Sequence, residues 1–352
     1  MRWIIPVTFC LALTLTPIVK KLAIHLGAID MPNERKVHSK IMPRLGGLAI
    51  YISFMLGFFY FINDRSGFWP IIVGGTLVSL IGIADDFCRL SAKVKFIGQL
   101  LASLIPAVSG LRIEYITFPD GKIISFGFLA IPITVFWIVS ITNAINFIDG
   151  LDGLAAGVST IAMITITTLA YPLGEMNAVL LGLLLIGSTL GFLVYNFYPA
   201  KIFMGDTGSL FIGYMISTLA IMGLTKSATV ISLIIPIIIL AVPIMDTFFA
   251  IMRRIYNGKP ITAPDKYHLH HCLIRLGFSH RQAVMMIYLL SGIFSLAAII
   301  FTKATIWGAT FIIVLLLLII ELIVEATGLI SLQYRPLLNL FAGKERLRNN
   351  GK

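Results

Sequence analysis

The sequence predicts an all-α integral membrane protein that crosses the bilayer many times. Of its 352 residues, 58% are apolar and only 12% are charged, whereas a soluble protein carries about 25% charged residues. The mean hydropathy is +0.96, and apolar runs close to the roughly 20 residues that span a bilayer recur along the chain. Lysines and arginines flank these runs, so the net charge of +11 indicates orientation in a membrane and not nucleic-acid binding.

About eleven apolar runs have the length of a transmembrane helix. They cover residues 3–24, 45–63, 68–84, 95–112, 128–147, 154–171, 177–195, 208–223, 228–250, 284–302 and 305–325. If the N-terminus lies outside, 21 of the 27 lysines and arginines fall on the inner side, as the positive-inside rule expects. We therefore predict a single transmembrane catalytic domain, 1–330, followed by a basic cytoplasmic tail, 331–352.

One outer segment predicts a small extracytoplasmic β-hairpin. Residues 113–127 alternate partly between apolar and polar side chains, and Asp120-Gly121 stands at the centre of the segment. An Asp-Gly pair favours the tight turn of a two-stranded hairpin.

Acids, amides and histidines gather at the predicted inner ends of five separate segments. The richest stretch is 142-TNAINFIDGLDGLAAG-157, and a histidine-rich loop, 265-DKYHLHH-271, follows the ninth run. The side chains concerned are Asp85, Asp86, Asn143, Asn146, Asp149, Asp152, Asp206, Asp246, His268, His270 and His271. Acids on the predicted outer side show no such clustering. The pattern indicates one assembled site at the inner face of the membrane.

The residue types in this set suit the binding of phosphate through a metal ion. Carboxylate and amide oxygens are the ligands that Mg²⁺ prefers, and the ion usually shares its shell with water and substrate phosphates. In 203-FMGDTGSLFIG-213, glycines allow backbone N–H groups to approach an anion beside Asp206. His268, His270, His271 and Arg253 offer donors to a phosphate.

Each motif by itself also has an ordinary structural explanation. Asp85-Asp86 could solvate a helix end, the glycine-rich stretch could form a turn, and Arg253-Arg254 could anchor the topology. A zinc site built from the histidines lacks a cysteine or a spaced carboxylate to complete it. The joint occurrence of the motifs is what indicates a functional site.

Five stretches, in this order, resemble the polyprenyl-phosphate N-acetylhexosamine-1-phosphate transferases of bacterial membranes, a glycosyltransferase 4 type of family. They are 34-ERKVHSKIMPRLGGLAIY-51, 84-ADDFCRLSAKVKFIGQ-99, 143-NAINFIDGLDGLAAGVS-159, 203-FMGDTGS-209 and 264-PDKYHLHHCLIRLGFSHRQ-282. The His-Leu-His-His sequence is similar to the branch that uses UDP-N-acetylglucosamine, in particular the enzymes that begin teichoic acid linkage units. The alternative branch, the phospho-N-acetylmuramoyl-pentapeptide transferases, usually has three adjacent histidines, and Leu269 interrupts them here.

The resemblance implies an activity and a location. N-acetylglucosamine-1-phosphate would pass from UDP-N-acetylglucosamine to undecaprenyl phosphate with release of UMP, as the first membrane step of a cell-wall glycopolymer such as teichoic acid. The enzyme would lie in the bacterial plasma membrane with its active site on the cytoplasmic face. The cofactor would be Mg²⁺, with Mn²⁺ as a substitute ion, and homodimers are common in the family.

The resemblance also implies roles for single residues. Asp206 matches the principal Mg²⁺ ligand, and Asp149 lies near the metal and the phosphates. Asp85 matches the acid–base residue beside the lipid phosphate, with Asp86 assisting. The full catalytic set is Asp85, Asp86, Asp149, His270 and His271. The expected substrate-binding set is Lys40, Asn143, Asn146, Asp152, Asn196, Phe203, His268 and Arg253, in which Asp152, Asn196 and Phe203 match a uridine pocket.

A carboxylate-using membrane transporter is the alternative from another functional class. Its acids should lie near the middle of the spans, on broken or repeated helices. In this sequence they stand at the ends of the runs, and no inverted repeat is evident. The pattern therefore favours an enzyme.

Overall fold

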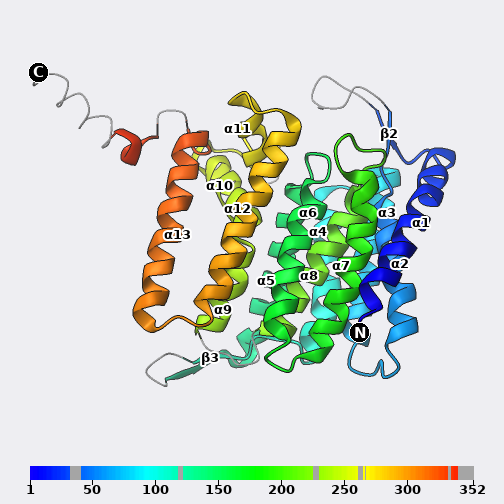
Figure 1. Ribbon diagram of the computed structural model, residues 1–352, viewed down its shortest axis with the longest axis horizontal. Coiled ribbons are helices and arrows are strands. Elements are labelled where there is room, and N and C mark those ends of the chain that lie inside the picture. Colours follow the sequence, from blue (N-terminus) through cyan, green and yellow to red (C-terminus); the bar gives the residue numbers. More distant parts are fainter. Residues whose placement is uncertain are drawn as a thin grey trace, which may run out of the picture.

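The computed structural model describes residues 1–31, 41–117, 122–224, 230–260, 265, 267–331 and 334–339, without the side chains of 230–232. Within these ranges, long helices stand side by side in a bundle, and the connections lie at its two ends (Figure 1). The helices are α1 (Ile4–His25), α2 (Gly47–Phe61), α3 (Trp69–Cys88), α4 (Ala92–Val108), α5 (Ala130–Phe147), α6 (Leu154–Ala170), α7 (Met176–Asn196), α8 (Gly205–Leu224), α9 (Val230–Ile239), α10 (Ala241–Tyr256), α11 (Leu269–Arg275), α12 (His280–Phe301) and α13 (Ile306–Thr327).

The predicted class, an all-α protein with several membrane spans, is confirmed. Among the described residues, seven helices are long and apolar enough to cross a membrane, namely α1, α3, α5 with the turn before it, α7, α8, α12 and α13. The helices α9 and α10 meet at 82° and would make an eighth span together. Each predicted run coincides with one of these helices, with the shorter α2, α4 or α6, or with the bent pair. The count of eleven stays a prediction, as does the division between 1–330 and 331–352.

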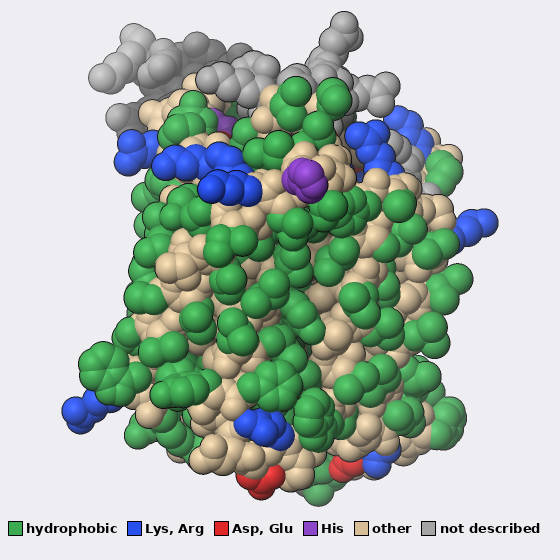
Figure 2. All heavy atoms as spheres, turned by 90° about the vertical axis from the view of Figure 1, so that its right-hand side faces the viewer, with side chains coloured by type: hydrophobic (Ala, Val, Ile, Leu, Met, Phe, Trp, Pro, Cys, Tyr) green, Lys and Arg blue, Asp and Glu red, His purple; other side chains and the backbone are tan. Residues whose placement is uncertain are grey.

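The surface is consistent with a bilayer around the middle of the bundle. Figure 2 shows hydrophobic side chains over the central part of one face, with several Lys and Arg side chains gathered towards the upper end. This end carries β2 and α11 in Figure 1. Apolar surface on this scale is costly in water, so the middle of the bundle belongs in lipid.

Helix α8 occupies the centre of the bundle. It packs against α2, α3, α5, α6 and α7, and every residue in it except Asp206 is buried. Small residues permit these close approaches, as is common between membrane helices. A Cβ on Gly47 of α2 would overlap the backbone of Gly208, and a Cβ on Gly82 of α3 would overlap that of Thr207. The first turn of α8 is therefore held tightly between α2 and α3.

Two small antiparallel sheets lie at opposite ends of the bundle (Figure 1). Strands β3 (Tyr115–Thr117) and β4 (Ile123–Ser125) form the predicted hairpin, although its Asp120-Gly121 turn lies outside the described residues. The sequence analysis did not predict β1 (Ile29–Asp30) and β2 (Met42–Pro43), which pair at the other end. This second pair matters for function because Arg44 follows it directly.

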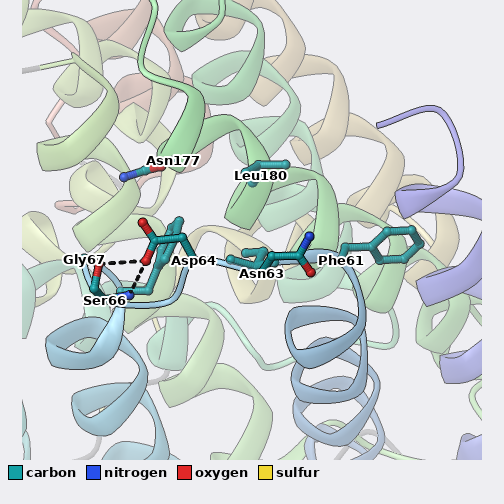
Figure 3. Close-up of a pocket in the computed structure, with 9 residues that line it drawn as sticks. Phe61, Asn63, Asp64, Ser66, Gly67, Asn177 and Leu180 are labelled. Atoms are coloured by element: carbon teal, nitrogen blue, oxygen red, sulfur yellow. Dashed lines mark hydrogen bonds between the residues drawn. The ribbon is translucent and has the colours of Figure 1, made fainter.

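A polar cavity of about 360 Å³ opens between the α2–α3 connection and the start of α7 (Figure 3). Asp64 lines it, but its carboxylate already accepts hydrogen bonds from the backbone N–H (3.1 Å) and hydroxyl (2.8 Å) of Ser66. Both hydrogen bonds lie within the α2–α3 connection and stabilise its local conformation. The acids predicted to be functional lie elsewhere.

Candidate active site

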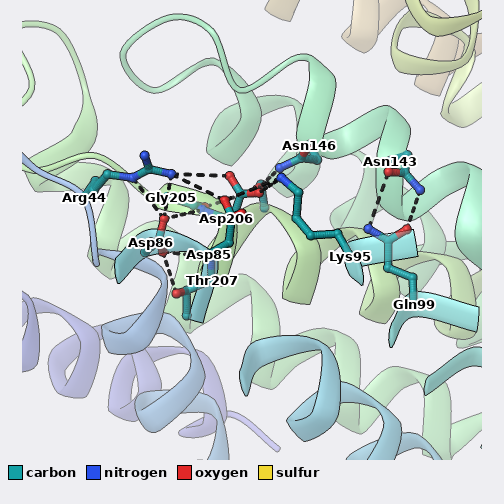
Figure 4. A network of polar contacts seen from close by, with 11 residues as sticks. Arg44, Asp85, Asp86, Lys95, Gln99, Asn143, Asn146, Gly205, Asp206 and Thr207 are labelled. Atoms are coloured by element: carbon teal, nitrogen blue, oxygen red, sulfur yellow. Dashed lines mark hydrogen bonds and ion pairs between the residues drawn. The ribbon is translucent and has the colours of Figure 1, made fainter. Parts of the chain in front are cut away.

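The predicted acids of α3 and α8 meet at the first turn of α8 (Figure 4). The Asp86 carboxylate accepts hydrogen bonds from the backbone N–H groups of Asp206 (3.0 Å) and Thr207 (3.1 Å) and from the Thr207 hydroxyl (2.6 Å). It thereby satisfies N–H groups that a helix start leaves without intrahelical partners. Asp86 is buried, so its geometry is that of a cap that fixes the position of Asp206.

Two cationic side chains lie among these carboxylates. The Arg44 guanidinium contacts Asp86 at 3.0 Å and lies 3.7 Å from Asp206 and 3.8 Å from Asp85. The Lys95 ammonium, from α4, lies 2.8 Å from Asp206 and 3.5 Å from Asp85. Asp85 and Asp206 therefore face both cations, whereas the neighbouring Asp86 contacts Arg44 and binds the first turn of α8.

Asp149 adds a fourth carboxyl group to the site. It lies in the connection between α5 and α6, where burial, and then the negative charges of Asp206 and Asp86, raise its pKa to about 8. With a pKa of about 8, Asp149 is mostly protonated near pH 7, so Asp85, Asp86 and Asp206 leave one negative charge in excess over Arg44 and Lys95. A divalent cation would offset that excess and favour the ionised form of Asp149, and the donor atoms are the oxygens that Mg²⁺ prefers.

The structure holds no ready-made cage for such an ion in its described ranges, where no group of three His, Cys, Asp or Glu side chains is arranged around a metal position. Mg²⁺ is usually bound by one or two carboxylates together with water and substrate phosphates. Asp206 and Asp149 fit that donor set. Their predicted metal role stays a prediction.

The two amides of the fifth run lie beside this cluster and are oriented by buried partners. Asn143 forms a reciprocal amide pair with Gln99 of α4, with N···O distances of 2.5 and 3.4 Å. Asn146 donates to the Ser209 hydroxyl at 2.8 Å. The two amides therefore connect α5 to α4, which carries Lys95, and to α8, which carries Asp206 (Figure 4).

Asp152 and Asn196 belong to a separate polar group at the same end of the bundle. The Asp152 carboxylate accepts from the Ala200 N–H at 2.9 Å, and its backbone N–H donates to the His280 ring at 2.9 Å. Asn196, the last residue of α7, accepts from the Gly153 N–H at 3.1 Å and donates to the Ile202 carbonyl at 3.0 Å. These two of the three residues predicted for the uridine pocket thus hold neighbouring turns together.

The histidine loop lies against the acidic stretch. His270 packs on Gly150, where a Cβ would overlap its ring, so the two segments can touch only because this position has no side chain. Burial, and then the neighbouring His271, lower the pKa of His270 to about 3. Its imidazole is therefore neutral near pH 7. The rings of His270 and His271 lie 4.2 Å apart.

The remaining predicted residues are placed as follows. Arg253 is buried and contacts Asp265 at 2.6 Å and the Leu329 carbonyl at 2.5 Å, so its guanidinium holds two chain segments together, and its substrate contact stays a prediction. The backbone of Phe203 pairs with Pro43 and Gly46, next to Arg44. Lys40 lies outside the described residues.

From the sequence, no site role was predicted for Arg44, Lys95 or Gln99, and Thr207 was only a candidate for the start of the eighth helix. Arg44 and Lys95 stood out only as inner basic residues. All four stand within the stretches that carry the family resemblance. That position was the signal available for finding them.

Comparisons with known proteins place this geometry in a family. The model of glycosyl transferase family 4 matches residues 68–224, which contain Asp85, Asp86, Lys95, Asp149 and Asp206. A probable undecaprenyl-phosphate N-acetylglucosaminyl 1-phosphate transferase from Bacillus subtilis is 51% identical over 94% of this chain and 93% of its own. The chain belongs to glycosyl transferase family 4.

Other relatives in glycosyl transferase family 4 are more distant. A decaprenyl-phosphate N-acetylglucosaminephosphotransferase from Mycolicibacterium smegmatis is 38% identical, over 80% of this chain and 77% of its own. An undecaprenyl-phosphate alpha-N-acetylglucosaminyl 1-phosphate transferase from Yersinia pestis is 28% identical, over 82% and 80%. The family resemblance expected from the sequence is thereby confirmed.

Proposed function

We propose that this protein transfers N-acetylglucosamine-1-phosphate from UDP-N-acetylglucosamine to undecaprenyl phosphate and releases UMP. The observation that carries the proposal is the cluster in which Asp85 and Asp206 share Arg44 and Lys95 at the start of α8. The names of relatives as close as 51% identity support the same donor sugar and acceptor. Neither the pentapeptide transferase nor the transporter gains support from these relatives.

The reaction exchanges one phosphoanhydride bond for another. A phosphate oxygen of the acceptor forms a bond to the phosphorus that carries N-acetylglucosamine. The bond between that phosphorus and the bridging oxygen of UMP breaks, and UMP leaves with the electron pair. These atoms balance whether the acceptor attacks directly or an aspartyl phosphate forms first.

The chain's own charges suit this exchange of anions. The acceptor phosphate is already anionic, so positioning and charge neutralisation contribute more than its deprotonation does. Arg44 and Lys95 provide fixed positive charge, and Asp85 lies within 4 Å of both, where it can take or return a proton at the acceptor oxygen. Asp86 holds the first turn of α8, and with it Asp206, in register.

Asp206 and Asp149 are the residues that would hold Mg²⁺ in this proposal. The ion, when bound, would neutralise the pyrophosphate and stabilise the charge that develops on the departing UMP. The excess of negative charge at the site and the oxygen donors of the two side chains support the assignment.

The position of the cluster at the end of the bundle suits a lipid acceptor. Its polyprenyl tail belongs in the bilayer, and its phosphate belongs at the boundary where the polar ends of α3 and α8 lie. We place this end on the cytoplasmic face of a bacterial plasma membrane, because the basic residues gather there. The product would begin a cell-wall glycopolymer such as teichoic acid.

Turnover by the purified full-length chain in lipid nanodiscs tests the function. We expect UMP release from UDP-N-acetylglucosamine that depends on both undecaprenyl phosphate and Mg²⁺, with one pyrophosphate-linked lipid formed for each UMP. A parallel reaction with UDP-N-acetylmuramoyl-pentapeptide should give none. The proposal would be rejected if the protein used the pentapeptide donor but not UDP-N-acetylglucosamine. It would also be rejected if UMP were released at the same rate without undecaprenyl phosphate.

A further inference from the structure

A buried carboxylate outside the acid cluster, that of Asp246, contacts the histidine loop. We propose that Asp246 is a positioning residue that fixes the orientation and the ring tautomer of His268, so that His268 presents one nitrogen to the pyrophosphate of the substrate. This inference rests on the proposed function for the identity of that substrate. The arrangement of the two side chains stands independently of it.

Asp246 contacts the loop with both of its carboxylate oxygens. One lies 2.9 Å from Nδ1 of His268, and the other accepts the backbone N–H of Leu269 at 2.7 Å. These two partners lie 22 and 23 residues further along the chain. Asp246 therefore fixes the ring of His268 and the backbone beside it as one unit.

The location of Asp246 makes a role in solvation or topology a poor explanation. It lies on the apolar helix α10 and is 1% exposed. An acid inside a membrane helix is energetically expensive and is normally retained for a function, with a specific partner. A hydroxyl or amide side chain could cap Leu269 at a lower cost in desolvation. The carboxylate is needed for the histidine.

The ring of His268 contacts two aromatic groups that connect it to the active site. It lies near Phe147 at the end of α5, with ring centroids 6.2 Å apart, and it stacks with His270, with centroids 5.9 Å apart and an angle of 4° between the ring planes. His270 packs in turn on Gly150, next to Asp149. His268 is thus connected to the stretch 143–152 through both rings.

The chemistry of a carboxylate–imidazole pair then defines what His268 can do. A carboxylate at Nδ1 requires a proton on that nitrogen, so the neutral ring has its lone pair at Nε2. When the ring carries a second proton, its Nε2–H can donate to a pyrophosphate oxygen. In either state Nε2 is the atom left for the ligand, and Asp246 determines its direction.

The first test measures the tautomer without using turnover. Histidine ring ¹⁵N spectra of the full-length protein, compared with those of His268→Gln to assign the signal, should show a proton on Nδ1 of His268. Asp246→Asn should move that proton to Nε2 or give a mixture of tautomers. Asp64→Asn, at the other end of the bundle, should leave the signal unchanged. An unaltered His268 signal in Asp246→Asn would overturn the proposal.

The second test uses a double-mutant cycle. Asp246→Asn should lower kcat by roughly 10–100-fold, as expected for loss of a supporting partner, and leave the Kd for UMP within about twofold. In a His268→Gln background, Asp246→Asn should lower kcat little further, because the two residues act as a unit. Equal losses in both backgrounds, or full turnover of His268→Gln alone, would contradict it.

These outcomes separate the two proposals. If the wild-type protein releases no UMP, the proposed function fails, whereas the ring spectra still decide whether Asp246 sets the tautomer. If the wild type is active and Asp246→Asn fails to fold, the wild-type spectrum and the turnover of His268→Gln decide the proposal. A proton on Nε2 of His268 in the wild type, or full turnover of His268→Gln, would overturn it.

Discussion

Asp206 is the partly exposed exception in the otherwise buried helix α8, and its carboxylate faces Lys95 at 2.8 Å. We expect Asp206→Asn to fold normally and to lose roughly 10²-fold or more in turnover, because the amide keeps the shape but gives up the charge that a metal ion requires. Rate measurements over a range of Mg²⁺ concentrations check this, with Asp64→Asn as the matched control. Near-normal turnover at limiting Mg²⁺ would rule out the metal role.

The adjacent Asp85 and Asp86 should respond differently to the same change. Asp85→Asn should lower kcat by roughly 10²–10⁴-fold, the range typical of a lost acid–base group, with the affinity for UMP nearly intact. Asp86→Asn should instead lower the free energy of unfolding by about 1–3 kcal/mol, because an amide cannot accept all the hydrogen bonds that this buried carboxylate receives. Thermal unfolding and steady-state kinetics on both variants distinguish the two roles. A stable Asp86→Asn would contradict the capping role.

The sequence was informative about single residues where chemistry depends on residue type. Acids and amides at the ends of apolar runs predicted the cluster, and the family resemblance implied different roles for Asp85 and Asp86. The sequence did not predict which carboxylates Arg44 and Lys95 contact. Arg44 is 42 residues from Asp86, and Lys95 is 111 residues from Asp206, so their contacts depend on how the helices pack.

At the scale of elements, the contact between α2 and α8 is the most demanding. Gly47→Ala should lower the free energy of unfolding by about 1–3 kcal/mol, the usual cost of overpacking, because the new methyl group overlaps the Gly208 backbone. Gly292→Ala is the matched control, since nothing lies within 4 Å of that position. Denaturation of both variants in one detergent makes the comparison. Equal stability of the two would refute this account of the helix contact.

The hydrophobic pattern predicted where helices lie but not how they bend. The run 228–250 predicted one span, whereas α9 and α10 meet there at 82°. Pro243, in the first turn of α10, has no N–H to donate to the carbonyl of Ile239, which removes one helical hydrogen bond at the junction. The pairing of β1 with β2 was equally hidden, because two-residue strands have no measurable periodicity.

For the whole molecule, the predicted orientation can be tested by chemical labelling. The sequence spacing of the three cysteines, Cys10, Cys88 and Cys272, is not that of a metal site. A variant with all three replaced by alanine should therefore remain active. In that background, a cysteine at Lys122, beside the hairpin, should react with a membrane-impermeant reagent added outside intact cells. A cysteine at Lys201, at the site end, should react only after the membrane is opened. The reverse pattern would place the active site outside.

The central position of α8 also bears on how the protein is made. Its main partners, α2, α3, α5, α6 and α7, all precede it in the chain. A membrane protein emerges from the ribosome N-terminus first, so these five neighbouring helices are synthesised before α8. Asp206 lies on the first turn of α8. It can contact Asp86, Arg44 and Lys95 only after α8 has packed against the earlier helices. Nascent chains that stop short of α8 therefore carry the cations and the α3 carboxylates but lack Asp206.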